Sequence, residues 1–242
     1  MLIKTEAIVL RHVKYGDSRM IVDLFTREAG RVSFATSVSG VSKASAARRR
    51  LFVPLALLDV ECDIRQGRSL QTFKSAHILY PLTSLSSDAY KLSIALFIAD
   101  FLCHALRGEQ RNEPLFDYIA DSLQWLDSRA EGFSNFHLVF LMRLSLFLGF
   151  YPNLEDYADG CSFDMRAGCF CMSAPMHADV LPPQEAAVIR TMMRMNFSTM
   201  HLFRLSREQR NRLVEVVVRY YRLHIPSFPE LRSFDILREL FV

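Results

Sequence analysis

The sequence predicts an α+β, multi-domain protein in which a five-stranded β-barrel is followed by an all-α helical domain. Two observations predict this order. Before Pro81, apolar residues recur with a period of two, as in half-buried strands, and after it with a period of 3.6, as in amphipathic helices. The chain has 242 residues, 50% of them hydrophobic, so each part is able to bury a core.

Five segments of the N-terminal part are rich in Val, Ile, Leu, Phe and Thr and are separated by turn residues. They are Ala7–Lys14, Arg19–Thr26, Val32–Val38, Leu51–Ile64 and Leu70–Leu79. So few antiparallel strands do not make an ordinary sandwich, whereas a small barrel of the OB type closes the sheet and removes its edges. An SH3-like barrel is the alternative.

Six segments after Pro81 have the helical period. They are Ser86–Arg107, Glu113–Arg129, Asn135–Gly149, Pro183–Met195, Ser206–His224 and Ser233–Leu240. Ser206 and Gln209 have the spacing of a capping box. We therefore expect an OB-fold domain over residues 1–82 and a helical domain over 83–242. A small irregular or hairpin insertion is expected at about 152–182, with a turn at Ala167-Gly168.

Charge is distributed unevenly along the chain. The net charge of +3 is composed of +6 over residues 1–80, −8 over 81–189 and +5 over 190–242. A basic head, an acidic middle and a basic tail indicate separate surfaces with separate partners, one of them polyanionic.

The strongest chemical signal is the cationic segment 42–50, which contains Lys43, Arg48, Arg49 and Arg50. Three adjacent guanidinium groups cannot all pair internally, so some of them face solvent or phosphate. Placed between two barrel strands, the segment is predicted to bind DNA, although a solvated surface loop is the alternative. Further cations at strand ends and turns extend the predicted DNA-binding patch: Lys14, Arg19, Arg31, Arg68 and Lys74.

Aromatic side chains matter for single strands because every base offers a face for stacking. The N-terminal part contains Tyr15, Phe25, Phe34, Phe52 and Phe73. Most of them occupy positions of the apolar alternation and are expected in the core. Binding is then mainly electrostatic, independent of base sequence and steeply dependent on salt.

No pattern indicates catalysis, a cofactor or a membrane segment. The chain has no nucleophile elbow, phosphate-binding glycine loop, His-Glu helix metal motif or paired carboxylates on one helix face. Cys161, Cys169 and Cys171 lack the paired spacing of a structural zinc site, so we expect free thiols and no metal. The N-terminus has no signal-peptide pattern, and we expect a cytoplasmic protein.

Several short motifs occur in an order that resembles the RecO family of bacterial recombination-mediator and repair proteins. They are Thr5-Glu6-Ala7-Ile8-Val9-Leu10, Tyr15-Gly16-Asp17-Ser18, the run Leu24–Gly30, Leu148-Gly149-Phe150-Tyr151-Pro152-Asn153-Leu154, Leu223-His224, Arg232-Ser233 and Ile236-Leu237. Some members carry a four-cysteine zinc site. Here Tyr157 lies near the first ligand position, so zinc is not carried over.

The resemblance implies an OB fold joined to a helical domain, DNA binding without an enzymatic active site, and work beside RecR and RecA, the latter indirectly. It also implies binding to single- and double-stranded DNA, annealing of complementary strands, and contact with the C-terminal tail of single-stranded-DNA-binding protein. Arg143 matches a basic position near the docking site of that tail. A nucleoid-associated protein of the cytoplasm is expected.

We therefore expect a DNA-binding mediator of repair that neutralises two phosphate chains at once and leaves their bases free to pair. Three alternatives stay open from the residues: a protein-interaction scaffold, a metal enzyme that uses the Cys/Asp loop, and a single-stranded RNA-binding module without annealing activity.

Overall fold

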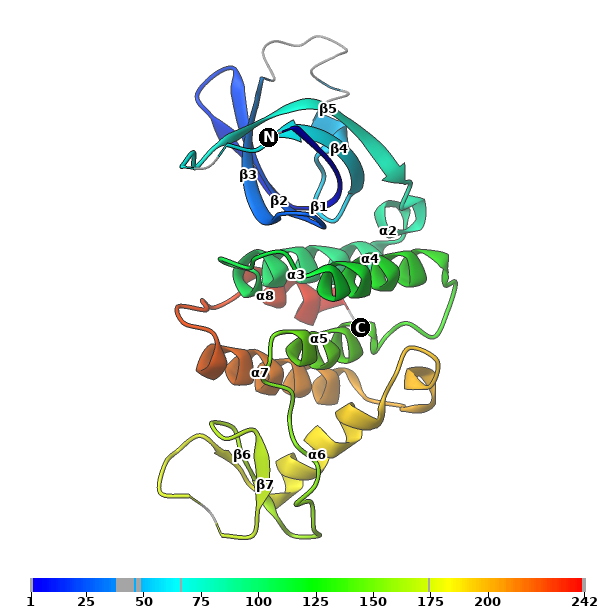
Figure 1. Cartoon of the computed structure of the whole chain (residues 1–242). Coiled ribbons are helices and arrows are strands. Elements are labelled where there is room, and N and C mark those ends of the chain that lie inside the picture. The colour runs from blue at the N-terminus through cyan, green and yellow to red at the C-terminus, as the bar shows by residue number, and fades with distance from the viewer. Residues whose placement is uncertain (1, 38–45, 47–48, 66, 174, 241–242) are drawn as a thin grey trace. The chain divides into compact units, whose positions relative to one another are not determined.

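The computed structural model describes residues 2–37, 46, 49–65, 67–173 and 175–240 (Figure 1). By its internal contacts the chain forms two compact units, residues 1–128 with 231–240 and residues 129–230 with 241–242. These units differ from the expected domains, which follow the change in secondary structure. The domain bounds 1–82 and 83–242 stay a prediction.

Five strands form a closed barrel in the order β1-β2-β3-β5-β4. They are β1 (Leu2–Tyr15), β2 (Arg19–Thr26), β3 (Gly30–Ser37), β4 (Leu57–Asp63) and β5 (Gln71–Tyr80). The first half of β1 pairs with β4 and its second half pairs with β2. β3 and β5 run parallel and pair only through Phe34–Gln71 and Ala35–Thr72. This strand order confirms the OB-type barrel.

Alternate side chains of these strands fill the barrel interior. Ala7, Val9, Val22, Leu24 and Val60 are all fully buried there. Three of the phenylalanines considered above complete the packing. The ring of Phe34 stacks on that of Phe73 at 4.3 Å between centroids, and Phe52 stacks on Phe73 at 5.2 Å.

The fourth predicted strand, Leu51–Ile64, is wrong in its first half. Residues 49–51 are helical, and β4 begins only at Leu57. Leu55 adopts φ 65°, a left-handed backbone that a regular strand does not accommodate at a non-glycine residue, and its N–H donates to the Val9 carbonyl at 2.7 Å. Pro54 before it has no N–H for a strand ladder. The residues from Phe52 to Ala56 therefore form a connection that contacts β1.

Four helices belong to the same unit as the barrel: α2 (Thr83–Ser87), α3 (Ala89–Ala105), α4 (Glu113–Ser128) and α8 (Arg232–Leu240). The carboxylate of Asp88 caps α3 by accepting from the N–H groups of Tyr90 and Lys91. α8 comes from the end of the chain and packs on α3, where Ser233 donates to the Asp100 carboxylate at 2.6 Å and Phe234 contacts Phe97.

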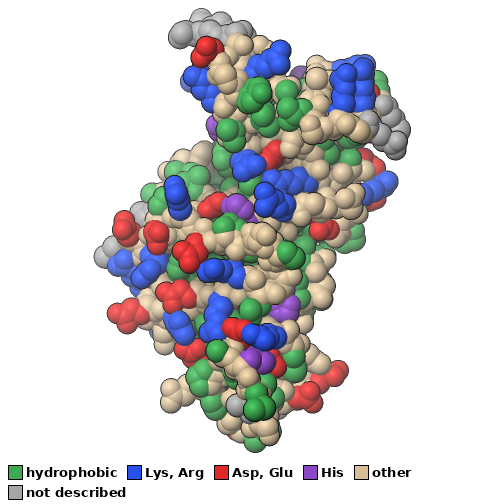
Figure 2. All heavy atoms as spheres, turned by 90° about the vertical axis from the view of Figure 1, so that its left-hand side faces the viewer, with side chains coloured by type: hydrophobic (Ala, Val, Ile, Leu, Met, Phe, Trp, Pro, Cys, Tyr) green, Lys and Arg blue, Asp and Glu red, His purple; other side chains and the backbone are tan. Residues whose placement is uncertain are grey.

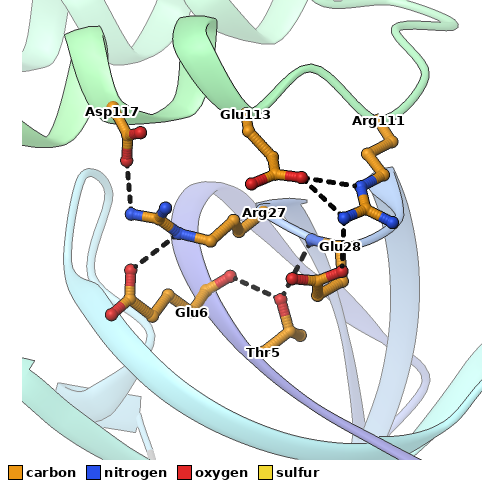
Figure 3. A network of polar contacts seen from close by, with 7 residues as sticks. All are labelled: Thr5, Glu6, Arg27, Glu28, Arg111, Glu113 and Asp117. Atoms are coloured by element: carbon orange, nitrogen blue, oxygen red, sulfur yellow. Dashed lines mark hydrogen bonds and ion pairs between the residues drawn. The ribbon is translucent and has the colours of Figure 1, made fainter.

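Ion pairs connect the barrel to the α3–α4 region (Figure 3). The guanidinium of Arg27, at the end of β2, lies between the carboxylates of Glu6 and Asp117. Arg111, just before α4, binds Glu28 at 3.1 Å. These contacts hold one end of the barrel on its helices.

The second unit contains α5 (Phe136–Phe147), α6 (Pro183–Arg194), the short 3-10 helix η1 (Met200–Leu202) and α7 (Arg207–His224). It also contains a three-stranded sheet in the order β7-β6-β8: β6 (Ser162–Asp164), β7 (Cys169–Cys171) and β8 (Val180–Leu181). The expected hairpin at Ala167-Gly168 is confirmed by the β6–β7 pairing. The capping box of Ser206 and Gln209 at the start of α7 is confirmed as well. Within the described residues, no helix has both the length and the apolar character needed to cross a bilayer.

Candidate nucleic-acid interface

The β1–β2 hairpin projects beyond the barrel core and carries two predicted DNA-binding residues. All residues from Arg11 to Arg19 are exposed. Lys14 lies opposite Met20, and Tyr15 lies opposite Arg19. Gly16 has φ +63°, so the turn uses a backbone conformation that glycine adopts without strain. The hairpin therefore presents Lys14, Tyr15 and Arg19 together at its tip.

The described residues on either side of the cationic segment, Ser37 and Phe52, contact this hairpin. Ser37, the last residue of β3, lies opposite Arg19 and donates from its hydroxyl to the Ser18 carbonyl at 3.4 Å. On the return of the chain, the Phe52 carbonyl lies 2.9 Å from Nδ1 of His12. Ser37 and Phe52, which flank the cationic segment in the chain, thus lie at the same end of the barrel. Two of its predicted contact residues, Lys43 and Arg48, lie outside the described residues, and Arg49 and Arg50 are exposed in a helical stretch.

The β4–β5 connection reaches the same part of the barrel. The amide nitrogen of Gln71 donates to the carbonyls of Arg65 and Arg68, at 3.0 Å and 2.8 Å, and so fixes the connection beside the start of β5. Gln71 pairs with Phe34, three residues before Ser37. Arg68 therefore lies near the C-terminal half of β3, and its side chain is exposed. Lys74 follows on β5 with its Nζ 4.0 Å from Glu61.

Five predicted cations at this end have no acidic partner within ion-pairing distance in the part of the chain that the structure describes. They are Lys14, Arg19, Arg49, Arg50 and Arg68. One carboxylate, Asp17, is exposed in the hairpin turn among them. Figure 2 shows Lys and Arg side chains distributed over the barrel, in the upper part of the view, with fewer acidic side chains between them. Such unpaired charge is available to phosphates.

Arg31 has a different environment, and its placement in the DNA-binding patch is not supported. Its guanidinium binds the Asp23 carboxylate at 2.9 Å and the Cys103 carbonyl at 2.5 Å, with 13% of the side chain exposed. Ser33 and Arg11 also donate to Asp23. Burial by itself raises the pKa of Asp23, but the hydrogen bonds from Ser33, Arg11 and Arg31 outweigh it and lower the pKa. Arg31 thus stabilises a carboxylate of the barrel wall.

The sequence did not single out Arg11, which lies opposite Asp23 in the β1–β2 register. Its side chain is 53% exposed although it is bound to Asp23. Alternation from Ala7 and Val9 would direct Arg11 into the barrel, and the β-bulge between Val9 and Arg11 moves it to the outer face. Its partner becomes recognisable only when the register of the two strands is known.

The candidate aromatic residues separate clearly by exposure. Phe25, Phe34 and Phe52 are buried, and Phe73 is half-buried in their stack. Tyr15 is 59% exposed at the hairpin tip. Of the five aromatic residues considered, Tyr15 alone presents its ring to solvent.

Arg143, the predicted partner-binding residue, lies in the second unit on α5. It is exposed one turn before Leu146, an apolar residue with 58% exposure. Burial raises the pKa of the nearby Tyr151, and the positive charge of Arg143 partly opposes that rise. Arg143 thus combines a cation with an exposed apolar neighbour.

The three clustered cysteines are free thiols on the small sheet. Cys161 is buried, and Cys169 and Cys171 are half-buried. Burial and the neighbouring Asp164 raise the pKa of both half-buried thiols, so their thiolate forms are disfavoured. In the described parts of the chain, no three His, Cys, Asp or Glu residues are grouped to hold a metal ion.

Comparison with known proteins gives matches along the whole chain. The family model described as "Recombination protein O N terminal" matches residues 1–82, and "Recombination protein O C terminal" matches 86–233. The chain is 52% identical over 241 residues to "DNA repair protein RecO" of Phocaeicola vulgatus. It is 48% identical over 242 residues to the protein so named from Bacteroides fragilis, and 37% identical over 244 residues to that of Porphyromonas gingivalis. Each match covers 100% of both chains.

Proposed function

Since this chain belongs to the recombination protein O family and functions in DNA repair and recombination, we propose that it is a non-enzymatic recombination mediator. It binds and anneals single strands of DNA, and it helps to load the recombinase on strands coated by single-stranded-DNA-binding protein. The observation that carries the proposal is the group of solvent-facing cations at one end of an OB-type barrel. OB folds bind oligonucleotides along the β2–β3 face and through the loops around it.

The barrel holds DNA through its phosphates. Lys14, Arg19 and Arg68 approach from the β1–β2 and β4–β5 connections, and Arg49 and Arg50 from the basic segment. The proposal extends to the flanking Lys43 and Arg48, which are outside the described residues, and to Lys74. Contacts to phosphate do not depend on the bases. Single and double strands, which both present phosphates, are therefore both expected to bind.

Annealing follows from charge neutralisation. Two complementary strands repel each other through their phosphates, and this repulsion slows their encounter. A protein that neutralises phosphates on both strands lowers the encounter barrier. Since its contacts leave the base edges free, the complementary strand reads the sequence.

The helical region holds the protein partners in this proposal. Arg143 on α5 contacts the acidic, apolar C-terminal tail of single-stranded-DNA-binding protein, while RecR binds the mediator and RecA is engaged indirectly. Recruitment by the tail brings the barrel to coated strands. The protein then works in the cytoplasm, at the nucleoid.

Polarisation of a labelled single strand tests the DNA contact. We compare Lys14→Ala/Arg19→Ala and Arg49→Ala/Arg50→Ala with Arg194→Ala/Arg204→Ala, which removes two exposed cations from the second unit and the same net charge. The first two variants are expected to weaken binding and to reduce the salt slope by about 0.7 for each lost phosphate contact. Equal losses in all three variants contradict a localised interface.

Strand annealing tests the function itself. Two complementary oligonucleotides are annealed with the wild-type protein, first bare and then coated with single-stranded-DNA-binding protein, with and without its C-terminal tail. We expect acceleration on bare strands and, on coated strands, a requirement for the tail. Wild-type protein that binds no DNA above background supports a pure interaction scaffold instead. A strong preference for RNA of the same sequence supports the RNA-binding alternative.

A further inference from the structure

An apolar and aromatic row lies on the outer face of the β1–β2 hairpin. Tyr15 lies opposite Arg19, and Val13 lies opposite Ile21. Residues two apart on a strand share a face, so these four side chains lie together. Lys14 and its partner Met20 take the other face, and Met20 is 3% exposed in the barrel core. The row of Tyr15 and Val13 therefore faces away from the core.

The Tyr15 side chain lies mostly in solvent. Its ring is 59% exposed, and neither a ring contact nor a hydrogen bond involves it in the described part of the chain. Val13 beside it is 50% exposed. A large, rigid aromatic side chain with most of its surface in solvent is available for a ligand with a flat apolar face.

The charges around the ring indicate which ligand this is. Arg19 lies directly across from Tyr15 on the same face of the hairpin and has no acidic partner among the described residues. Lys14, the preceding residue, belongs to the other face. A flat face beside a phosphate-binding cation matches one nucleotide, with the base on the ring and its phosphate on Arg19. Only an unpaired base offers an accessible face to the ring, because both faces of a base inside a duplex are covered by its stacked neighbours.

We propose that Tyr15 is a base-stacking residue and that it makes the interface prefer single strands over duplexes. This inference rests on the proposed function and deepens it. The phosphate contacts are the same for both forms of DNA, whereas the stacking contact exists only while the base is unpaired. Pairing with the complementary strand therefore removes one contact and favours release of the annealed product.

Affinity measurements with the full chain and matched DNA test this inference. Tyr15→Ala, Tyr15→Phe and the control Tyr90→Ala, an exposed tyrosine on α3, are compared on oligo-dT, on an abasic strand of equal length and charge, and on a duplex. We expect Tyr15→Ala to weaken oligo-dT binding by about 5- to 100-fold. Binding to the abasic strand and to the duplex is expected to change less than twofold, and Tyr15→Phe is expected to keep the wild-type affinity.

A spectroscopic measurement gives an independent readout. The chain has a single tryptophan, Trp125, so Tyr15→Trp adds one reporter at the hairpin tip. Stacking of thymine on this indole quenches its fluorescence, and we expect quenching with oligo-dT and none with the abasic strand. Quenching by both strands, or by neither, overturns the inference.

The outcomes separate this inference from the proposed function. If wild-type protein binds oligo-dT and Tyr15→Ala binds it equally well, the stacking role is wrong and the electrostatic interface stands. An equal loss on oligo-dT, abasic strand and duplex also overturns the stacking role. If the wild-type protein binds none of the three, the proposed function fails and the inference fails with it.

Discussion

The guanidinium of Arg31 and the carboxylate of Asp23 lie 2.9 Å apart in the wall of the barrel, and only 6% of the Asp23 side chain is exposed. Asp23 is therefore a buried charge that depends on its partners. Arg31 supplies one of them from the next strand, and it also donates to the Cys103 carbonyl at the end of α3. One side chain thus connects two strands and a helix of the first unit.

Arg31→Leu is expected to lower the free energy of unfolding by about 2–4 kcal/mol, because it leaves a buried carboxylate with fewer partners. Urea denaturation measures the loss. Arg19→Ala, also in the β2–β3 part of the barrel but exposed, is the matched control and is expected to change stability by less than about 0.5 kcal/mol while weakening DNA binding. A stable Arg31→Leu protein with weak DNA binding would return Arg31 to the interface.

Gly30 has no room for a side chain, whereas Gly16 has. Both have a left-handed backbone, with φ +66° and +63°. A Cβ at Gly30 meets the backbone of Glu109 and Gln110, 2.5 Å from the Glu109 oxygen, and nothing lies within 4 Å at Gly16. We expect Gly16→Ala to cost about 1 kcal/mol of stability for the backbone alone and Gly30→Ala to cost at least about 3 kcal/mol, as measured by thermal unfolding. Similar losses in both variants contradict this packing.

His137 on α5 is expected to make the protein sensitive to mild acid. Burial, with a smaller contribution from the charge of Arg210, lowers its pKa from 6.5 to about 3. Between these values the unfolded chain binds a proton that the folded chain does not, so stability falls as pH falls below 6.5. The slope amounts to roughly 1.4 kcal/mol per pH unit for one group.

Urea denaturation between pH 7 and 4 measures this slope, and His137→Leu is expected to flatten it. His201→Gln, at an exposed histidine, is the control and is expected to keep the slope. Asp23 does not interfere in this range, since its lowered pKa affects stability only below about pH 4. An unchanged slope in His137→Leu would assign the acid sensitivity to other groups.

Arg143→Glu is expected to weaken binding of a peptide with the acidic tail sequence of single-stranded-DNA-binding protein by at least about fivefold, because one exposed ion pair is replaced by repulsion. DNA affinity at the barrel is expected to stay within twofold. Arg194→Glu on α6 makes the same charge change in the same unit and serves as the control. Equal effects of the two variants would indicate general electrostatics and no docking site at Arg143. Calorimetric titration with the free peptide measures the affinities.

The period of the apolar residues and the positions of turn residues were sufficient to predict most strands and helices. The predicted strand Arg19–Thr26 has the same bounds in the structure, because it is rich in residues that favour strands and turns flank it. Leu51–Ala56 was not predictable in this way. Phe52, Leu55 and Ala56 are buried, but the left-handed backbone at Leu55 depends on a hydrogen bond with Val9, which is distant in sequence.

The same limit applies to the candidate interface. In the sequence, a basic residue that faces phosphate, as proposed for Arg19, cannot be distinguished from one that binds a buried carboxylate, as Arg31 does. The difference depends on the β2–β3 register and on a helix that begins some sixty residues later, at Ala89. Exposure likewise distinguishes Tyr15 from the phenylalanines, and only the assembled barrel reveals it.

The order in which the chain enters its two units has a consequence for biosynthesis. The first unit is interrupted after residue 128 and is completed by α8, which the ribosome delivers only after residues 129–230 of the second unit. Until then, the surface of α3 that receives Phe234 stays uncovered in the nascent polypeptide. A product that terminates before Arg232 lacks α8, and the apolar surface of α3 that contacts Phe234 stays exposed. Such an exposed apolar surface is expected to be recognised by chaperones and proteases.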